Sequence, residues 1–152
     1  MRRRDREITD KAAIESIIRR SLVCRLGLSK GNQPYVVPLC FGYEDGTLYF
    51  HCAREGMKVD ILRANDAVCV EFDIDQELVR GNEACGCAMR YRSAIAFGRA
   101  SFVEGADAKR KALDVLMRQY SDESHEYSDE ALAKVTVVKV DIESMTGKQS
   151  GY

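Results

Sequence analysis

The sequence predicts a mainly β protein, a small antiparallel β-barrel with peripheral helices. Its extended runs are rich in β-branched and aromatic residues, and most of them follow one another through short turns. The expected order of elements, α-β-β-β-α-β-β-α-β, does not fit the strand–helix alternation of a doubly wound parallel sheet. A length of 152 residues indicates one domain, residues 1–152.

The charge balance argues against a nucleic-acid-binding or membrane-binding protein. There are 23 basic and 24 acidic residues, so no global field attracts a polyanion. No segment approaches the ~20 apolar residues of a membrane span, and the basic cluster Met1–Arg4 lacks the apolar run of a signal peptide. We therefore expect a cytoplasmic protein, with Met1–Arg4 as a solvated tail or a contact to a phosphate or to another subunit.

The six cysteines are expected to be reduced, because no secretory signal is apparent. Four of them lie in apolar runs and behave as small hydrophobic residues. Cys85-Gly86-Cys87 lies instead in a polar segment, but zinc would require a second close pair, and His51 and His125 are not at ligand spacing. No metal site is predicted, and His125, in an acidic segment, is expected to be a solvated surface group.

The first elements are a helix and a strand. Asp10 is a suitable N-cap, and Ile14, Ile17, Ile18 and Leu22 form an apolar stripe at helical spacing. Residues 23–28 read as a strand that ends in the turn cluster 29–32. In this strand Cys24, Leu26 and Leu28 are expected to face the side opposite Val23, Arg25 and Gly27.

The stretch from Tyr35 to Lys58 carries the clearest functional signal. Two extended runs, Tyr35–Phe41 and Thr47–Cys52, are joined by the turn residues Glu44–Gly46, which predicts a β-hairpin. Pro38 cannot donate to a sheet ladder, so it marks an edge strand, a bulge or a place where a ligand replaces the neighbouring strand.

A loop that opens a helix follows this hairpin. Gly56 allows close approach of a ligand to the backbone, and the free N–H groups of a helix start attract an anion. Lys58 adds a positive charge, although it could also be an ordinary surface lysine. The loop Ala53–Lys58 is therefore predicted to bind a phosphate group.

The second half of the chain adds strands, a loop and a helix. We expect the helix after Lys58 to stop at Asn65-Asp66, a polar loop or irregular hairpin over 74–89, and a tail after residue 143. Gly98 is expected to permit a bulge or a sharp bend. The remaining expected elements are strands at 67–73, 91–103 and 135–142, a helix at 106–120 and a loop at 121–128. No dinucleotide-binding glycine motif, Walker loop or nucleophile elbow is present.

A series of short motifs resembles the flavin-binding split-barrel proteins related to pyridoxamine 5′-phosphate oxidase, and among them the 5-nitroimidazole antibiotic resistance group. The motifs occur in the same order over nearly the whole chain. They are Met1–Ile8, Cys24–Gly27, Pro34–Leu39, Gly46–His51, Gly56–Lys58, Tyr91–Ser93, Phe97–Ala100 and Thr146–Lys148. One departure is Cys87, at a position where relatives often have a bulky aromatic residue, which implies a more open wall beside the flavin.

The resemblance implies an FMN-binding split barrel that forms a homodimer with two flavin sites at the subunit interface, FAD being the alternative cofactor. The backbone of Val37, Pro38 and Leu39 would face the isoalloxazine ring, and His51, Cys52 and Ala53 would line its edge and ribityl chain. Met57 and Lys58 would hold the phosphate. Tyr91, Arg92 and Ser93 would approach from the neighbouring strand or from the partner subunit.

The leading functional hypothesis is an FMN-dependent oxidoreductase that acts on a small nitroaromatic, quinone or similar acceptor. His51 is the candidate catalytic residue, because an imidazole with an ordinary pKa can deliver a proton to the reduced flavin or the substrate. A hydrogen-bonded strand histidine is the alternative, and Arg92 could equally form a surface ion pair. A flavin-binding or storage protein without turnover is the second hypothesis. A barrel for single-stranded nucleic acid is disfavoured by the neutral charge.

Overall fold

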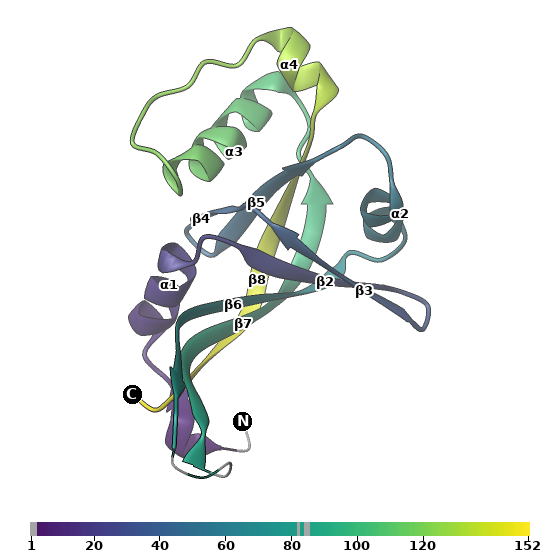
Figure 1. Ribbon diagram of the computed structural model, residues 1–152. Helices are drawn as coiled ribbons and strands as arrows, with labels where there is room; N and C mark the ends of the chain where they lie inside the picture. Colours follow the sequence, from purple (N-terminus) through teal and green to yellow (C-terminus); the bar gives the residue numbers. More distant parts are fainter. Residues whose placement is uncertain (1–2, 82, 84–85) are drawn as a thin grey trace.

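The computed structural model describes residues 3–81, 83 and 86–152. An eight-stranded antiparallel sheet in the order β3-β2-β6-β7-β8-β5-β4, with β1 added on β8, forms the body of the molecule (Figure 1). The strands are β1 (Glu7–Ile8), β2 (Cys24–Lys30), β3 (Gln33–Leu39), β4 (Gly42–Glu44), β5 (Thr47–Cys52), β6 (Ala67–Val79), β7 (Ala88–Phe102) and β8 (Thr136–Ser150). The helices are η1 (Arg4–Arg6), α1 (Lys11–Arg20), α2 (Met57–Ala64), α3 (Ala106–Arg118) and α4 (Asp129–Lys134).

The sheet curls around one large apolar core, which confirms the predicted mainly β barrel with peripheral helices. Phe41, Phe50 and Phe72 are fully buried in this core, and the rings of Phe41 and Phe72 meet edge to face at 5.1 Å. The barrel is split, because β3 and β4 are the two ends of the strand order and do not pair with each other. No helix in the described part of the chain is long and apolar enough to cross a membrane.

Helix α1 closes one end of the barrel and begins where the sequence predicts. The carboxylate of Asp10 accepts a hydrogen bond from the N–H of Ala13 at 3.0 Å, which is the expected N-cap. Ile14, Ile17 and Ile18 are buried, but Leu22 lies beyond the end of the helix and is exposed, so its assignment to the stripe was wrong. The predicted alternation of β2 is confirmed by its buried residues Cys24, Leu26 and Leu28.

The predicted hairpin between residues 35–41 and 47–52 is wrong in its pairing. The Asp45-Gly46 turn exists, and both residues have positive φ angles (48° and 81°), as the tightest hairpin turns require. It joins β5 to the short strand β4, whereas β3 pairs with β2 through the turn after Lys30. The residues between Leu39 and Gly42 carry the chain from one edge of the sheet to the other.

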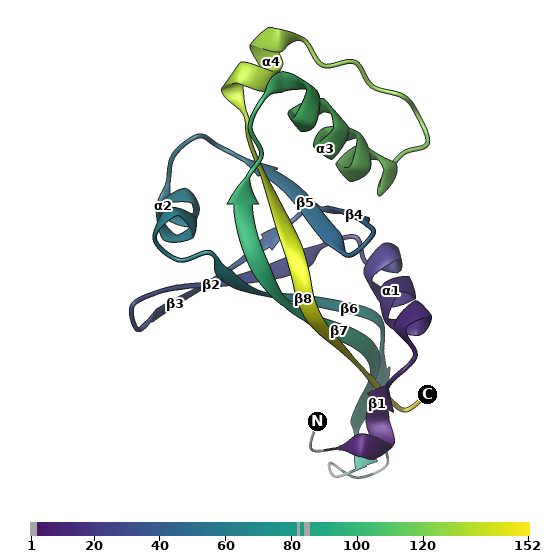
Figure 2. The same ribbon diagram turned by 180° about the vertical axis from the view of Figure 1, so that it is seen from behind.

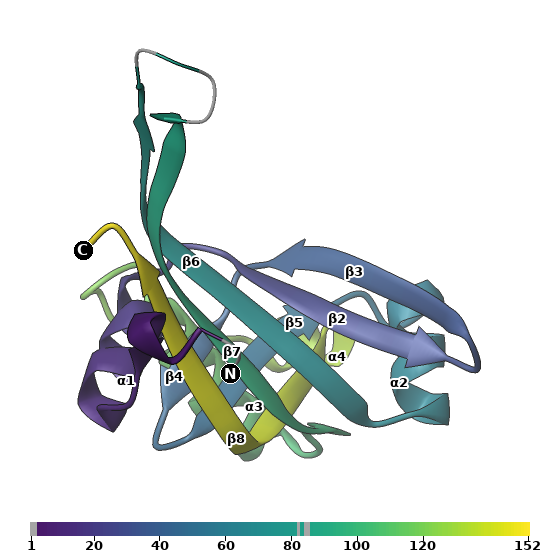
Figure 3. The same cartoon turned by 90° about the horizontal axis from the view of Figure 1, so that it is seen from below.

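The segment expected to be a polar loop over 74–89 is mostly strand. β6 continues to Val79 and β7 begins at Ala88, so the two strands form a ribbon that projects from the barrel as an arm (Figure 3). A register shift between Ile74 and Glu77 marks the point where the arm leaves the body. Of the two alternatives predicted for this segment, the irregular hairpin is confirmed and the polar loop is wrong. The sequence could not decide between them because a two-stranded ribbon that is exposed on both faces lacks the alternation of a half-buried strand.

The predicted tail after residue 143 is also strand. β8 continues to Ser150, pairs with β7 along its length and receives β1 at Gly147 (Figure 2). A Cβ atom at Gly147 would lie 2.7 Å from the side chain of Ile14, so this polar-looking half of β8 packs on α1. Helix α4, which the sequence did not indicate, begins at the N-cap Ser128. The bulge expected at Gly98 is confirmed by the register shift between Phe97 and Gly98.

Candidate functional site

The start of α2 lies just beyond the end of β5, and its backbone donors are free. Gly56 has φ 122°, a conformation that favours glycine, and it turns the chain into the helix. No side chain caps this terminus, whereas Asp10 caps α1 and Ser128 caps α4. The first N–H groups of an uncapped helix attract an anion through hydrogen bonds and through the helix dipole.

Lys58 lies in the first turn of α2 and is half-buried. Its Nζ atom lies 5.7 Å above the centroid of the Phe50 ring, a cation–π arrangement. Among the residues that the structure describes, no carboxylate lies within ion-pair distance of Lys58. Burial raises the pKa of the neighbouring Cys52 thiol, and the charge of Lys58 opposes that rise. The start of α2 therefore combines free N–H donors with an unneutralised cation.

The other residues predicted to contact the cofactor here fall into two groups, one partly buried and the other exposed. Val37 and Leu39 on β3 and Cys52 on β5 pack partly buried against the main core. Pro38 is exposed on the outer face of the edge strand β3, which confirms the edge-strand interpretation of this proline. Ala53 and Met57 are exposed on either side of the loop that leads into α2.

His51 points away from this group. Successive residues of a strand face opposite sides, and Phe50 and Cys52 both face the main core. His51 is therefore exposed on the other side of β5, the side on which Tyr49 packs near α3. Its role as a proton donor stays a prediction and receives no support from this geometry.

Tyr91, Arg92 and Ser93 lie at the opposite end of the sheet. Cys52 pairs with Thr136 on β8, whereas Ser93 pairs with Lys148 of the same strand, twelve residues further on. At about 3.3 Å per residue these levels are roughly 40 Å apart. One flavin mononucleotide cannot span that distance, so a single chain does not bring all of the predicted residues together.

Arg92 also has a partner within its own chain. Its Nη1 donates to Oδ2 of Asp75 at 2.6 Å, and Arg20 contacts the other carboxylate oxygen at 2.5 Å. Hydrogen bonds from Arg92 and Arg20 hold the pKa of Asp75 below its ordinary value. The ion pair considered for Arg92 from the sequence is therefore present.

The outer face of the sheet carries an apolar row that sequence analysis missed. Val36, Gly27, Cys69 and Phe97 are paired in succession across β3, β2, β6 and β7. Phe97 is 51% exposed, and Val36 is 63% exposed. The sequence does contain a signal for this row. All four residues of the run Ala94–Phe97 are apolar, so both faces of the strand are apolar, as in a strand that is buried on both sides.

A charged group adjoins this row. Arg25 on β2 forms ion pairs with Glu71 and Asp73 on β6. Burial, followed by the neighbouring carboxylate of Asp73, raises the pKa of Glu71 above its ordinary value, and Arg25 opposes that rise. The outer face therefore combines exposed apolar side chains with a compact, internally paired polar group.

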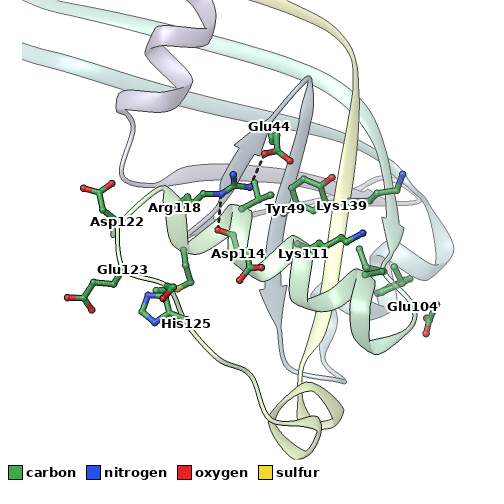
Figure 4. Close-up of a pocket in the computed structure, with 17 residues that line it drawn as sticks. Glu44, Tyr49, Glu104, Lys111, Asp114, Arg118, Asp122, Glu123, His125 and Lys139 are labelled. Atoms are coloured by element: carbon green, nitrogen blue, oxygen red, sulfur yellow. Dashed lines mark hydrogen bonds and ion pairs between the residues drawn. The ribbon is translucent and has the colours of Figure 1, made fainter.

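A cavity of about 950 Å³ lies elsewhere, between α3, the segment after it and the sheet (Figure 4). Tyr49, Lys111 and Lys139 line it, and Arg118 crosses it to pair with Glu44 at 2.8 Å. None of the predicted cofactor-binding residues lines this cavity. No residue of α2 or of the loop that opens it lines this cavity, so it is not the predicted phosphate site.

His125 also lines this cavity. The expectation that it is fully solvated was wrong. It is half-buried, and its Nε2 atom is inaccessible and lacks a hydrogen-bond partner in the described part of the structure. The segment after α3 folds back over the cavity, which covers the imidazole (Figure 4).

Of the cysteine pair in the polar segment, Cys87 lies on the arm. Cys87 is exposed beside the start of β7, and Cys85 lies outside the described residues. Within residues 3–81, 83 and 86–152, no group of three or more metal-ligating His, Cys, Asp or Glu side chains gathers.

Comparisons with known proteins agree with this architecture. A family model described as pyridoxamine 5′-phosphate oxidase matches residues 10–149. The search of curated proteins gave no match. The chain is 42% identical to a candidate 5-nitroimidazole antibiotic resistance protein from Bacteroides thetaiotaomicron, whose crystal structure superposes with a TM-score of 0.86 over 94% of this chain and 86% of that one.

Two more distant structures share the fold. One is a FAD and heme binding protein from Mycobacterium smegmatis, 20% identical, with a TM-score of 0.85 over 97% of this chain and 74% of that one. The other is a flavocytochrome from Azotobacter vinelandii, 17% identical, with a TM-score of 0.87 over 100% and 72%. With the family match covering almost the whole sequence, the split barrel described above belongs to the pyridoxamine 5′-phosphate oxidase family.

Proposed function

We propose that this protein binds FMN and acts as a flavin-dependent oxidoreductase on a small nitroaromatic, quinone or similar acceptor. The observation that carries the proposal is the start of α2, where an uncapped helix terminus and Lys58, which has no carboxylate partner among the described residues, belong to the same turn. Free N–H donors and a positive charge together attract an anion. A flavin phosphate supplies that anion.

The residues present fit the cofactor. Lys58 and the N–H groups of the first turn of α2 would hold the phosphate, and Gly56 lets it approach the backbone closely. Val37, Pro38 and Leu39 would offer the free backbone edge of β3 to the ring, with Cys52 and Ala53 along the ribityl chain. The proline fits this arrangement because an edge that faces a ring system needs no ladder donor at that position.

The flavin itself would supply the electron-transfer chemistry. The chain would contribute position and electrostatics: the open edge of β3 beside the ring, and the positive charge of Lys58 at the phosphate. An exposed ring face would admit a flat acceptor. His51 lies on the other side of β5, so this proposal does not depend on it as a proton donor.

A second copy of the chain would complete the site. Ile142 lies six residues from both Thr136 and Lys148 on β8, and it pairs with Gly98, next to Phe97. The exposed apolar row on the outer face therefore crosses β7 midway between the two separated groups of predicted residues. A two-fold axis at this level would place the Lys58 end of one subunit against Tyr91 and Ser93 of the partner subunit, because such an interface is self-complementary. Arg92 lies on the other side of β7, with Ala94 and Ala96, and joins Asp75 and Arg20 there.

The acceptor class follows from the 42% identical relative and its description as a candidate 5-nitroimidazole antibiotic resistance protein. The alternative is a flavin-binding or storage protein without dedicated turnover. That alternative is favoured by one observation, the position of His51 outside the group around Lys58.

The cofactor proposal is tested by titrating the flavin-free protein with FMN, FAD and riboflavin. We expect FMN to bind more tightly than riboflavin, because riboflavin lacks the phosphate. Lys58→Met should weaken FMN binding about 10- to 100-fold, the range of a lost charge-assisted contact, and leave riboflavin binding unchanged. Arg63→Met, at the other end of the same helix, is the matched control. A protein that binds none of the three flavins contradicts the proposal.

Turnover is tested separately under anaerobic conditions. The loaded protein is mixed with NADH or NADPH, and the bleaching of the oxidised flavin band is followed. A nitroimidazole or a quinone is then added, and the band should return if the acceptor takes electrons. Flavin that remains oxidised with both nicotinamides, or reduced flavin that neither acceptor reoxidises, would favour the binding or storage function.

A further inference from the structure

The cavity between α3, the segment after it and the sheet has no part in the proposed flavin site (Figure 4). Its volume of about 950 Å³ falls within the range of pockets that hold small molecules. Apolar side chains from α3 and from the chain around the end of β7 line it, namely Phe102, Val103, Ala112, Val115 and Met117. Phe102 and Met117 favour an aromatic ligand, because rings and thioethers both make favourable contacts with a bound ring.

Three hydrogen-bond donors lie at one end of this cavity. Tyr49 on β5 and Lys139 on β8 are paired across the sheet, and Lys111 faces them from α3 (Figure 4). Lys139 donates to Asp141 at 2.8 Å. Within the described part of the chain, neither Nζ of Lys111 nor the hydroxyl of Tyr49 has a hydrogen-bond or ion-pair partner. This end therefore presents two ammonium groups and a hydroxyl to a ligand, an arrangement that suits a carboxylate.

Three of the carboxylates that line the cavity do not occupy these donors. Glu44 pairs instead with Arg118, at the end of α3, at 2.8 Å. Asp122 and Glu123 belong to the segment after α3, and their side chains point away from that helix (Figure 4). These three acidic groups therefore leave the charge of Lys111 unopposed.

Two further carboxylates line the cavity, those of Asp114 and Glu104. Asp114 lies near the buried hydroxyl of Tyr127, and burial, followed by the charge of Asp114, raises the pKa of this tyrosine. Glu104 precedes α3 and lies at the same end of the cavity as Lys111 (Figure 4). It forms no ion pair with any described residue, so its charge opposes a bound anion without satisfying the donors.

The other end of the cavity holds an imidazole without a partner. Nε2 of His125 is inaccessible and has no hydrogen-bond partner among the described residues, and Figure 4 shows this side chain away from Lys111 and Lys139. Along α3 the distance from Lys111 to Arg118 is about 10 Å, which is the length of a two-ring aromatic compound. A buried polar atom without a partner is unfavourable, so a ligand that brings a polar group to this end gains a hydrogen bond there.

We infer that the cavity is a second ligand site, for an aromatic carboxylic acid that carries a hydroxyl group at the end opposite its carboxylate. The three donors at one end bind the carboxylate. The rings lie along the apolar side chains of α3, and the hydroxyl reaches Nε2 of His125. The site shares no residue with the group around Lys58, so it is independent of the proposed function.

Isothermal titration calorimetry of the FMN-loaded protein with 6-hydroxy-2-naphthoate tests the carboxylate end. Lys111→Met should weaken binding about tenfold, the scale of one charge-assisted hydrogen bond, and should leave binding of the neutral 2-naphthol unchanged. Lys134→Met, on α4 and outside the cavity lining, is the matched control and should bind as the parent protein does. Glu104→Gln should tighten binding about twofold, because it removes a charge that repels the carboxylate.

The His125 end is tested by comparing 6-hydroxy-2-naphthoate with 2-naphthoate. The parent protein should bind the hydroxylated acid about threefold to tenfold more tightly, the scale of one hydrogen bond, and His125→Phe should remove that difference. Equal affinity of the parent protein for the two acids, or binding of neither, would overturn the inference.

Two more outcomes would count against this site. Equal binding by Lys111→Met and Lys134→Met would show that the lysine end takes no carboxylate. Release of FMN as the naphthoate binds would place the naphthoate in the flavin site instead. A protein that binds no FMN refutes only the proposed function, and the same titrations on the flavin-free protein still test the cavity.

Discussion

Gly98 on β7 lies so close to Asp141 on β8 that a Cβ atom at position 98 would come within 2.3 Å of the Asp141 carbonyl oxygen. The contact coincides with the register shift at Phe97, where β7 bends. Backbone atoms on both sides form this contact, so no side-chain rotation can relieve the clash.

Gly98→Ala is therefore expected to destabilise the fold by about 2–4 kcal/mol, the scale of severe overpacking. Urea unfolding followed by circular dichroism measures the change. Ser101→Ala, at an exposed position of the same strand, is the control and should stay within about 0.5 kcal/mol of the parent. Equal stability of the two variants would show that β7 can shift to accept the methyl group.

Phe97→Asp is expected to separate the two chains of the proposed dimer, because a charge would be buried in the apolar row of the outer face. Light scattering coupled to gel filtration measures the mass, and the bound flavin should be lost together with the partner subunit. Ser101→Asp adds the same charge farther along β7 and should remain dimeric. A flavin-bound monomer of Phe97→Asp would contradict the proposed completion of the site by a second chain.

Tyr120 gives the protein a defined sensitivity to alkaline pH. Its hydroxyl donates to the carbonyl of Leu22 and accepts the N–H of Phe41, both at 2.9 Å. Burial raises the pKa of Tyr120 to about 12, above its ordinary value of 10.0. Between these two values the unfolded chain loses a proton that the folded chain retains, so the free energy of unfolding should fall as pH rises from about 10 to 12.

Tyr120→Phe should make that alkaline fall shallower. The remaining part comes from other groups whose pKa is raised mainly by burial, among them Tyr43 and Cys24, both to about 12. At neutral pH the same variant should be less stable by about 1–2 kcal/mol, because it loses both hydrogen bonds. Chemical unfolding at several pH values checks both statements, and parallel pH profiles for the two proteins would contradict them.

The cysteines should differ sharply in reactivity. Burial raises the pKa of Cys24 to about 12, whereas Cys40 and Cys87 are exposed. Because the thiolate is the reacting form, brief treatment of the folded protein with iodoacetamide should label Cys40 and Cys87 and spare Cys24. Peptide mass mapping before and after unfolding in urea measures this. Labelling of Cys24 in the folded state would show that β2 opens locally.

Local sequence patterns predicted the elements that have one apolar face and one polar face. In β2 the alternation of Cys24, Leu26 and Leu28 predicts the buried side, and Asp10 marks the start of α1. For the opposite reason, the second half of β8 was missed and the arm could be predicted only as either a loop or an irregular hairpin. Their polar residues face solvent or pack through glycine, as Gly147 does, so the apolar period that indicates a strand is absent.

These local patterns could not predict which strands, distant in the sequence, pair with one another in the sheet. The run 47–52 was assigned to the wrong neighbour because an extended sequence does not specify which strand lies beside it. The helix start at Gly56 and Lys58 was predicted, since a helix start is a local feature. The row that ends at Phe97 was not, because its members come from four strands that meet only in the folded sheet.

Both prolines of the chain, Pro34 and Pro38, lie in the edge strand β3. An open edge normally templates the addition of another chain, which leads to fibrils, and proline interrupts the row of donors that such growth requires. The opposite edge is the three-residue strand β4, where Gly42 lies directly against the backbone of α3. Both routes to edge-to-edge polymerisation are therefore obstructed, and copies of this chain can associate through their faces without the risk of endless sheet growth.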